Sequence, residues 1–188
     1  MLTMENNKVY LSFARHGRYG MDTDIEHMSM LEAFLSGQRL RQELPLCEAI
    51  YYSPISRAAM TAKFYGLGMH CRHLLAKREL EEDMSTFVIR RFIDNIIQNS
   101  TPEEKHYHFV THQPVIEKLG LPDLETCGLC WCVADNWQDM LSENYEIVKG
   151  PAVSHEELNR LLEKLRIDPA DLEKFSPDAI YSALSRVK

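Results

Sequence analysis

The sequence has no excess of basic residues and no long apolar run. Its 188 residues hold 21 Lys and Arg against 28 Asp and Glu, a formal net charge of −7. Nucleic acids and anionic membranes favour a basic surface, so this charge argues against both as partners. No apolar run approaches the length of a membrane span, and residues 1–8 lack the basic start and apolar stretch of a signal peptide. We therefore expect a cytoplasmic protein that binds neither nucleic acid nor membrane.

Cysteine is also scarce. The chain has five cysteines, an odd number that favours reduced thiols over a disulfide framework when no secretory signal is present. Cys127, Cys130 and Cys132 lie close enough in sequence to raise the question of a metal site. Their segment has the pattern of a buried strand, however, and no second cysteine or histidine cluster of zinc-finger spacing accompanies it. We predict neither a metal nor another cofactor.

The remaining composition is that of an ordinary globular domain. Hydrophobic residues make up 45% and charged residues 26% of the chain, which excludes a largely disordered protein. Apolar segments with strand character alternate with segments of helical periodicity. This alternation predicts an α/β three-layer sandwich, with a mainly parallel central sheet and helices on both faces. The predicted strands are 8–14, 49–52, 71–75, 107–111, 126–134 and 145–148.

Helical periodicity and capping signals place the helices between these strands. Ser53 and Pro54 have the pattern of an N-cap and a first helical residue, and Gly66 and Gly68 are expected to close that helix. Residues 136–144 are predicted to form a loop. The other predicted helices in this part of the chain are 30–44, 87–99 and 114–120.

The last part of the chain changes to helical patterns alone. Ser154 with Glu157 has the spacing of a capping box, and a leucine stripe follows it. Asp168-Pro169 and Ser176-Pro177 have the pattern of two further helix starts. We therefore divide the chain into an α/β domain at residues 1–150 and a C-terminal helical appendage at 151–188. We expect the leucine stripe to pack on the α/β domain rather than to bind a partner.

Polar residues with related chemistry follow three of the predicted strands. Arg15 and His16 end the first strand, Arg57 lies just past the second, and His112 follows the fourth. Because the carboxyl ends of parallel strands share one edge of a sheet, these side chains are expected to converge. Two guanidinium groups can grip the oxygens of a phosphate, and helix amino ends add N–H donors. The pattern therefore predicts a phosphate site.

Two imidazoles in a phosphate site suggest a division of labour. His16, beside the phosphorus, could attack it, because neutral imidazole is nucleophilic near neutral pH. His112 could donate to the oxygens that gain charge in the transition state. The leaving oxygen also needs a proton, which a carboxyl group can supply. Spacing alone leaves four candidates open for that role: Glu79, Glu81, Glu82 and Asp83.

Three ordered sequence blocks resemble the signature blocks of a known family. The resemblance covers roughly residues 8 to 135, and three ordered blocks are far more specific than any one of them. The family is the histidine phosphatase superfamily, with the phosphoglycerate-mutase-like fold, and the chain is most similar to its small phosphohistidine-phosphatase branch. The blocks are Arg15-His16-Gly17, the segment from Ser53-Pro54 through Arg57 to Thr61-Ala62, and Val110-Thr111-His112-Gln113-Pro114.

This resemblance implies a phosphohistidine mechanism without metal. It makes His16 the nucleophile and a carboxylate the proton donor, and the Leu-x-Glu block of the family makes Glu82 the first choice. It also implies a substrate loop at Arg18 and Tyr19. The residues that it implies for binding the phosphoryl group are Arg15, Arg57, His112 and Gln113, with His112 also counted as catalytic.

The expected function is that of a phosphatase acting on a phosphomonoester or a phosphorylated protein side chain. The alternative is a weakly active or inactive member that binds a phosphorylated ligand or partner. Asp22 motivates it, because it falls where many members have a phosphate-contacting asparagine, and a carboxylate there repels phosphate unless it points away or pairs with Arg18. A mutase is less favoured, since only 54 residues separate Arg57 from His112. The expected partner is a phosphorylated small molecule or phosphoprotein, and a homodimer is left open.

Overall fold

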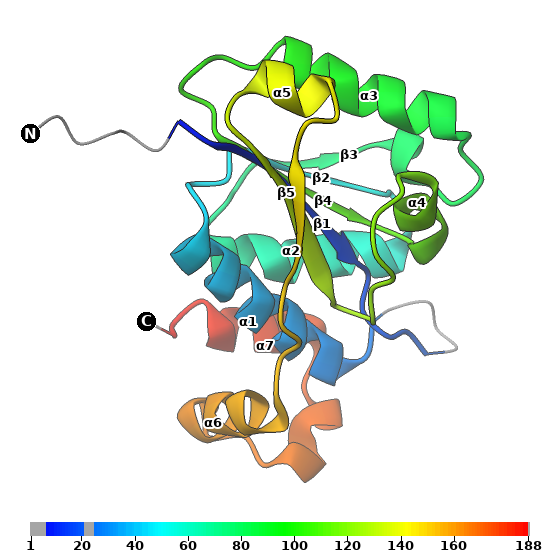
Figure 1. Ribbon diagram of the computed structural model, residues 1–188. Coiled ribbons are helices and arrows are strands. Elements are labelled where there is room, and N and C mark those ends of the chain that lie inside the picture. The colour runs from blue at the N-terminus through cyan, green and yellow to red at the C-terminus, as the bar shows by residue number, and fades with distance from the viewer. Residues whose placement is uncertain (1–6, 21–24, 188) are drawn as a thin grey trace, which may run out of the picture.

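The computed structural model describes residues 7–20 and 25–187, and its centre is a mixed sheet (Figure 1). The described strands have the order β3-β2-β4-β1-β5-β6. The pairs β1/β4, β4/β2 and β2/β3 are parallel, whereas β5 pairs antiparallel with β1 and β6 antiparallel with β5. The strands are β1 (Val9–Arg15), β2 (Ala49–Tyr52), β3 (Leu74–Ala76), β4 (His106–Thr111), β5 (Leu129–Ala134) and β6 (Glu146–Lys149).

Helices cover both faces of this sheet, as the alternating pattern predicted (Figure 1). Alternate residues of β1 point to opposite faces, so that Leu11 and Phe13 pack with α3 and α5, while Tyr10 and Ala14 pack with α1 and α2. The helices are α1 (His27–Glu43), α2 (Ser56–Met69), α3 (Thr86–Gln98), α4 (Gln113–Lys118), α5 (Trp137–Leu141), α6 (His155–Leu165) and α7 (Pro177–Leu184), with 3-10 turns η1 (Arg78–Leu80) and η2 (Pro169–Lys174).

Several of the predicted boundaries were wrong. The helix expected from Ser53-Pro54 begins at Ser56 with Ile55 as its N-cap, because the Ser53 hydroxyl lies 2.9 Å from the His112 imidazole instead of capping a helix. The strand expected at 71–75 covers only 74–76, at the edge of the sheet. The expected loop 136–144 contains α5, which the Asn136 side chain caps by accepting a hydrogen bond from the Asp139 backbone.

Gly66 and Gly68 do not close α2, which continues to Met69 and ends at His70 with a φ of 57°. The glycines at Gly37 and Gly68 instead allow α1 and α2 to pack closely. A Cβ at Gly68 would lie 2.1 Å from the Phe34 carbonyl oxygen, and one at Gly37 would lie 2.5 Å from the Tyr65 oxygen. Both atoms that block a side chain belong to the backbone, so neither can move aside without shifting a helix.

Gly68→Ala is therefore expected to destabilise the protein, although alanine is the better helix former. Forcing α1 and α2 apart should lower the free energy of unfolding by about 3 kcal/mol, the scale of core overpacking. Urea unfolding of the two proteins would measure this difference. Gly20→Ala is the matched control, since a Cβ there meets nothing within 4 Å. A midpoint for Gly68→Ala equal to that of the control would contradict the close-packing explanation.

Two buried histidines share one hydroxyl inside the sheet. The Pro45 carbonyl accepts a hydrogen bond from Nδ1 of His106 at 3.1 Å, so Nε2 of His106 is unprotonated and accepts from Ser12 Oγ at 2.7 Å. Ser12 has then donated its only proton, and Nδ1 of His108 donates to it at 2.7 Å. These roles require uncharged rings, and burial lowers the pKa of His106 to about 4 and that of His108 well below its ordinary value.

Acidification is expected to weaken the fold through these imidazoles. Between pH 6.5 and 4 the unfolded chain takes up a proton at His106 that the folded protein excludes, so stability falls as the pH falls. One imidazole with this shift contributes a loss of about 3 kcal/mol at pH 4. Urea unfolding at several pH values would measure the slope. His106→Gln should flatten it, and an unchanged slope in that variant would contradict the assignment.

The C-terminal helices pack against α1 and α2, on the side away from the sheet (Figure 1). Their buried apolar residues, among them Leu161, Ile180 and Leu184, belong to the same core cluster as α1 and α2. The predicted capping box at Ser154 and Glu157 is confirmed, and Asp168 and Ser176 cap η2 and α7 as expected. Among the described residues, no helix combines the length and apolarity that crossing a bilayer requires.

Candidate active site

The three polar strand ends come together because β2, β4 and β1 are parallel neighbours in the sheet. His16 directly follows β1, Arg57 lies in the first turn of α2 behind β2, and His112 is the N-cap of α4 behind β4. Glu82 reaches the same place from the loop after β3 and η1. One edge of the sheet therefore gathers two imidazoles, a guanidinium and a carboxylate.

His16 is buried, with 6% of its surface exposed, and its ring orientation is determined by two contacts. The Gly17 carbonyl oxygen accepts from Nδ1 at 2.8 Å, so the proton is on Nδ1. The Arg57 Nε–H donates to Nε2 at 3.2 Å, which identifies Nε2 as the atom with the lone pair. Burial, together with the positive charges of Arg57 and Arg15, lowers the pKa of His16. At neutral pH the ring is an uncharged base with Nε2 facing the cluster.

His112 lies beside it, with the ring centroids 5.0 Å apart. Its Nε2 lies 2.9 Å from Ser53 Oγ, whereas the buried Nδ1 has no hydrogen-bond partner. A Glu82 carboxylate oxygen is 3.0 Å from Nδ1, but this contact lacks hydrogen-bond geometry and is one of charge and proximity only. Burial and the neighbouring His16 lower the pKa of His112 to about 4. His112 thus presents an unsatisfied ring nitrogen to the cluster.

Arg57 connects Glu82, the predicted proton donor, to His16, the predicted nucleophile. Its Nε donates to His16, its Nη2 pairs with the Glu82 carboxylate, and its guanidinium lies 4.7 Å from the centre of the Tyr19 ring. The Glu82 carboxylate accordingly contacts both Arg57 and His112. These are two of the groups predicted to hold the phosphoryl oxygens, so a carboxylate occupies the place expected for a bound anion.

The position of Glu82 depends on contacts that sequence analysis did not identify. Lys118 Nζ donates to the carbonyl oxygens of Glu82 and Met84, at 2.6 and 2.8 Å. Thr111 Oγ1 donates to the Leu80 carbonyl at 2.7 Å and so fixes the start of the loop. Lys118 is the last residue of α4, and no signal in the sequence linked it to this loop.

Of the four carboxylates left open by spacing, Glu82 is the one that contacts Arg57 and His112. Glu81 instead pairs with Arg78, at 3.5 Å.

Two of the other predicted phosphate ligands have part of their polar groups engaged elsewhere. Arg15 Nη1 donates to the Leu124 carbonyl at 2.9 Å, while its buried Nε has no hydrogen-bond partner. The side-chain amide of Gln113 donates to Glu117 at 3.2 Å and accepts from the Leu124 backbone at 3.2 Å. Arg15 therefore retains a free donor, whereas both polar atoms of Gln113 are bound outside the cluster.

The predicted substrate loop lies at the edge of the cluster. The half-exposed Tyr19 ring lies 5.6 Å from that of His16, in an edge-to-face arrangement. Arg18 points elsewhere, with its Nε 3.4 Å from Thr126 Oγ1 and its backbone N–H donating to Ser29 Oγ. Asp22, which raised the question of repulsion, lies outside the described residues.

The loop after β1 is locked to α2 by a threonine. Gly17 N–H donates to Thr61 Oγ1 at 2.9 Å, and this hydroxyl donates to the Arg57 carbonyl at 2.7 Å. Glycine is required at 17, because a Cβ there would lie 2.7 Å from that of Ser29. These bonds connect the backbone of the Arg-His-Gly block to that of Arg57.

Among the residues that the structure describes, one group of side chains could approach a single metal ion, and this group lies in the cluster. Ligand atoms of His16, Glu82 and His112 lie within 4.8 Å of one another. The Arg57 guanidinium, however, contacts both His16 Nε2 and the Glu82 carboxylate. A fixed positive charge therefore lies at the atoms that would have to bind the cation, which makes the set a better fit for an anion.

The sequence matches no protein-family profile and no curated protein. Solved structures, in contrast, share the fold. The protein histidine phosphatase SixA, complexed with tungstate, has a TM-score of 0.61 at 15% identity over 81% of this chain and 99% of that one. The ecdysone phosphate phosphatase from Bombix mori, also with tungstate, scores 0.57 at 11% identity over 78% and 95%. A phosphoglycerate mutase from Bacillus anthracis scores 0.58 at 13% identity over 82% and 97%.

These matches span nearly the whole of each solved chain, and their low identities make them evidence about the fold. They agree with the three sequence blocks, each of which the structure places where a parallel strand ends. The chain therefore has the fold of the histidine phosphatases, as its sequence blocks predicted.

Proposed function

We propose that the protein is a phosphatase that hydrolyses a phosphomonoester or a phosphorylated protein side chain through a phosphohistidine on His16. The observation that carries this proposal is the orientation of His16. Its Nε2 is unprotonated, buried and directed at Arg57, in a cluster that already holds the carboxylate of Glu82 as an anion. A nucleophilic lone pair beside an anion-binding group is the arrangement that attack on phosphorus requires.

The first step follows from these contacts. Phosphoryl oxygens take the place of the Glu82 carboxylate at Arg57 and His112, with Nε–H of Arg15 as a further donor. His16 Nε2 forms a bond to phosphorus while the bond from phosphorus to the leaving oxygen breaks. Displaced from Arg57, Glu82 takes up a proton from solvent and gives it to the leaving oxygen, and the product leaves as an alcohol.

Hydrolysis of the phosphohistidine completes the cycle. The Glu82 carboxylate takes a proton from water as the water oxygen bonds to phosphorus, the bond from phosphorus to Nε2 breaks, and inorganic phosphate is released. Arg57 remains paired with the phosphoryl oxygens throughout and balances the charge that they gain.

We further infer that this chemistry needs no metal ion. Arg57 supplies the positive charge at the very atoms that a metal would bind. Phosphate release that survives dialysis against a chelator would agree with this, and activity restored only by an added divalent ion would contradict it.

SixA is described as a protein histidine phosphatase, which makes a phosphohistidine-bearing protein the first substrate to test. The purified protein should release phosphate from a panel of phosphohistidine, phosphoserine and aryl phosphates. A phosphoryl group that stays on the protein after a rapid quench, and that is acid-labile but base-stable, would identify the phosphohistidine. If phosphate and vanadate raise the melting temperature but no substrate turns over, the binding-only alternative would replace the proposal.

Glu82→Gln should separate the two roles of this carboxylate. Without the competing negative charge, Arg57 and His112 should bind vanadate about tenfold more tightly. Without the proton donor, kcat should fall by about 100-fold for an alkyl phosphate but far less for p-nitrophenyl phosphate, whose leaving group needs no proton. Steady-state kinetics and vanadate inhibition would measure both effects.

Glu81→Gln is the matched control, since it pairs with Arg78 outside the cluster. Equal losses of kcat on the two substrates in Glu82→Gln would rule out the role of Glu82 as proton donor.

A further inference from the structure

Two of the five free cysteines meet where two parallel strands begin. Cys47 lies two residues before β2, and Cys71 lies three residues before β3. The register pairs Ile50 with Leu74, so counting back three residues on both segments places Cys47 level with Cys71. Neighbouring strands are about 4.8 Å apart, within the range of about 4.4–6.8 Å that a disulfide requires between Cα atoms.

Both sulfur atoms lie around one peptide unit of β2, the unit that joins Ala49 to Ile50. Cys47 Sγ donates to the Ala49 carbonyl oxygen at 3.3 Å. Cys71 Sγ lies 3.9 Å from the His73 carbonyl oxygen, which accepts a hydrogen bond from Ile50 N–H at 2.8 Å. The two thiols also contact each other through a side-chain hydrogen bond. The backbone therefore directs both thiols to the same place.

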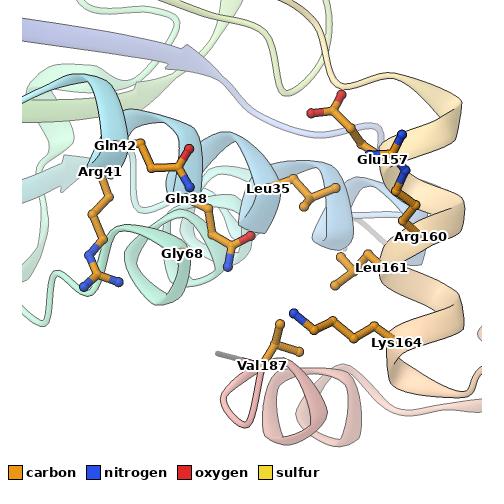
Figure 2. Close-up of a pocket in the computed structure, with 10 residues that line it drawn as sticks. All are labelled: Leu35, Gln38, Arg41, Gln42, Gly68, Glu157, Arg160, Leu161, Lys164 and Val187. Atoms are coloured by element: carbon orange, nitrogen blue, oxygen red, sulfur yellow. The ribbon is translucent and has the colours of Figure 1, made fainter.

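The backbone before Cys71 is held by the ends of α1 and α2. Cys71 N–H donates to the Gly66 carbonyl oxygen at 2.9 Å, directly after His70, the left-handed residue that ends α2. Arg41, in the last turn of α1 (Figure 2), lies with its Nη1 3.0 Å from Nε2 of His70. Two thiols that are in contact on a fixed backbone can form a bond without movement of the chain.

Cys71 is the nucleophile of this pair. The hydrogen bond from Cys47, followed by the contacts with His73, lowers the pKa of Cys71 to about 7. Part of the sulfur is therefore thiolate near neutral pH, and the thiolate is the form that reacts with oxidants. Cys47 is half-buried, and both chain neighbours of the buried Cys71 are exposed, so the pair lies just beneath the surface.

The other three cysteines lack these features. Cys127, Cys130 and Cys132 are buried, and burial raises the pKa of each thiol, to about 12 for Cys130 and Cys132. Their sulfur atoms stay protonated at neutral pH and react slowly with oxidants. The chain therefore contains its own reference for the reactivity of the pair.

We propose that Cys47 and Cys71 form a redox-active pair, which a peroxide converts into a reversible disulfide that ties the start of β2 to the start of β3. The proposal does not depend on the phosphatase activity. The pair lies at the amino ends of these strands, whereas Arg57 and Glu82 of the cluster follow their carboxyl ends. The bond therefore acts on the stability of the fold rather than on the chemistry of the cluster.

The oxidation takes two steps. The Cys71 thiolate attacks one oxygen of hydrogen peroxide, the O–O bond breaks, and the released hydroxide becomes water with the proton that the thiol had lost. The Cys47 sulfur then bonds to the sulfur of the resulting sulfenic acid, the sulfur–oxygen bond breaks, and the Cys47 proton leaves with the hydroxide as a second water. The two thiols together lose two electrons, which reduce one peroxide to two waters.

The test treats the reduced full chain with hydrogen peroxide and counts the thiols after denaturation. We expect a monomer that has lost two of its five thiols, and a proteolytic peptide in which Cys47 is linked to Cys71. Dithiothreitol should restore all five thiols. Because the bond closes a loop from residue 47 to residue 71, the melting temperature should rise by about 5–10 °C on oxidation.

Cys71→Ser should abolish the linked peptide. Cys47→Ser should abolish it too and should leave a sulfenic acid on Cys71 that dimedone traps, because the serine hydroxyl still offers a donor to the Cys71 sulfur. Cys132→Ala is the matched control, in which the linked peptide should form as in the parent protein. Circular dichroism would verify that each variant is folded.

Three results would overturn the proposal. The first is a protein that keeps all five thiols under peroxide. The second is a protein in which the oxidised thiols are any other two, or in which the cysteines link only between separate molecules. The third is a protein with the expected linked peptide but an unchanged melting temperature, since the bond would then not tie the two strands together.

Discussion

His16→Ala is expected to lower kcat for phosphate release by about four orders of magnitude on every substrate of the protein. The variant lacks the Nε2 lone pair that forms the bond to phosphorus. His112 is not expected to replace it, because its Nε2 is engaged with Ser53 and its Nδ1 lies against the Glu82 carboxylate. Losses of this size are typical when an enzyme nucleophile is removed. Release of phosphate from an aryl phosphate, together with loss of the acid-labile phosphoprotein, would measure the effect.

Two controls separate chemistry from folding in this experiment. His73→Ala removes an exposed imidazole outside the cluster and should leave kcat unchanged. Vanadate should still raise the melting temperature of His16→Ala, because Arg57 and His112 remain to bind it. If His16→Ala kept the activity of the parent protein, the phosphohistidine mechanism would be wrong.

Arg57→Lys is expected to lower kcat/KM by about 100- to 1000-fold although it keeps the positive charge. Arginine contacts His16 through Nε and Glu82 through Nη2 at the same time, which one ammonium group cannot reproduce. Phosphoryl oxygens would also lose a forked pair of donors. Kinetics on an aryl phosphate and the inhibition constant of vanadate would measure both losses.

Arg90→Lys is the matched control for this substitution. Arg90 lies on α3 and pairs with Glu143 rather than with a residue of the cluster, so its replacement should leave kcat/KM unchanged. Full activity in Arg57→Lys would show that only the charge at position 57 matters. The claim that activity needs both contacts of Arg57 would then be wrong.

Much of this site could be predicted because its main residues lie just after the ends of parallel strands. The order of β2, β4 and β1 brings together His16, Arg57 and His112, although the first and last of them are 96 positions apart. Parallel strands with apolar runs are recognisable in a sequence, and their carboxyl ends must lie at a common edge. The fold class was predictable for the same reason.

The groups that support the site were not predictable. Ser53 had the pattern of a helix cap but bonds His112, and Lys118 holds the loop of Glu82 by its backbone. Both contacts join segments distant in sequence through side chains with many other possible partners. Gly68 was misread for a related reason: a glycine that allows two helices to touch has the same sequence signal as one that ends a helix.

The central position of β1 also affects how the protein can be made. This strand carries His16 and is synthesised before both of its neighbours, because β4 and β5 lie much further along the sequence. Until residue 106 and those after it have been synthesised, Val9, Leu11 and Phe13 have no strand beside them to pair with. Until then the nascent chain must keep this apolar segment from associating wrongly, and chaperone binding to residues 9–15 is the expected result.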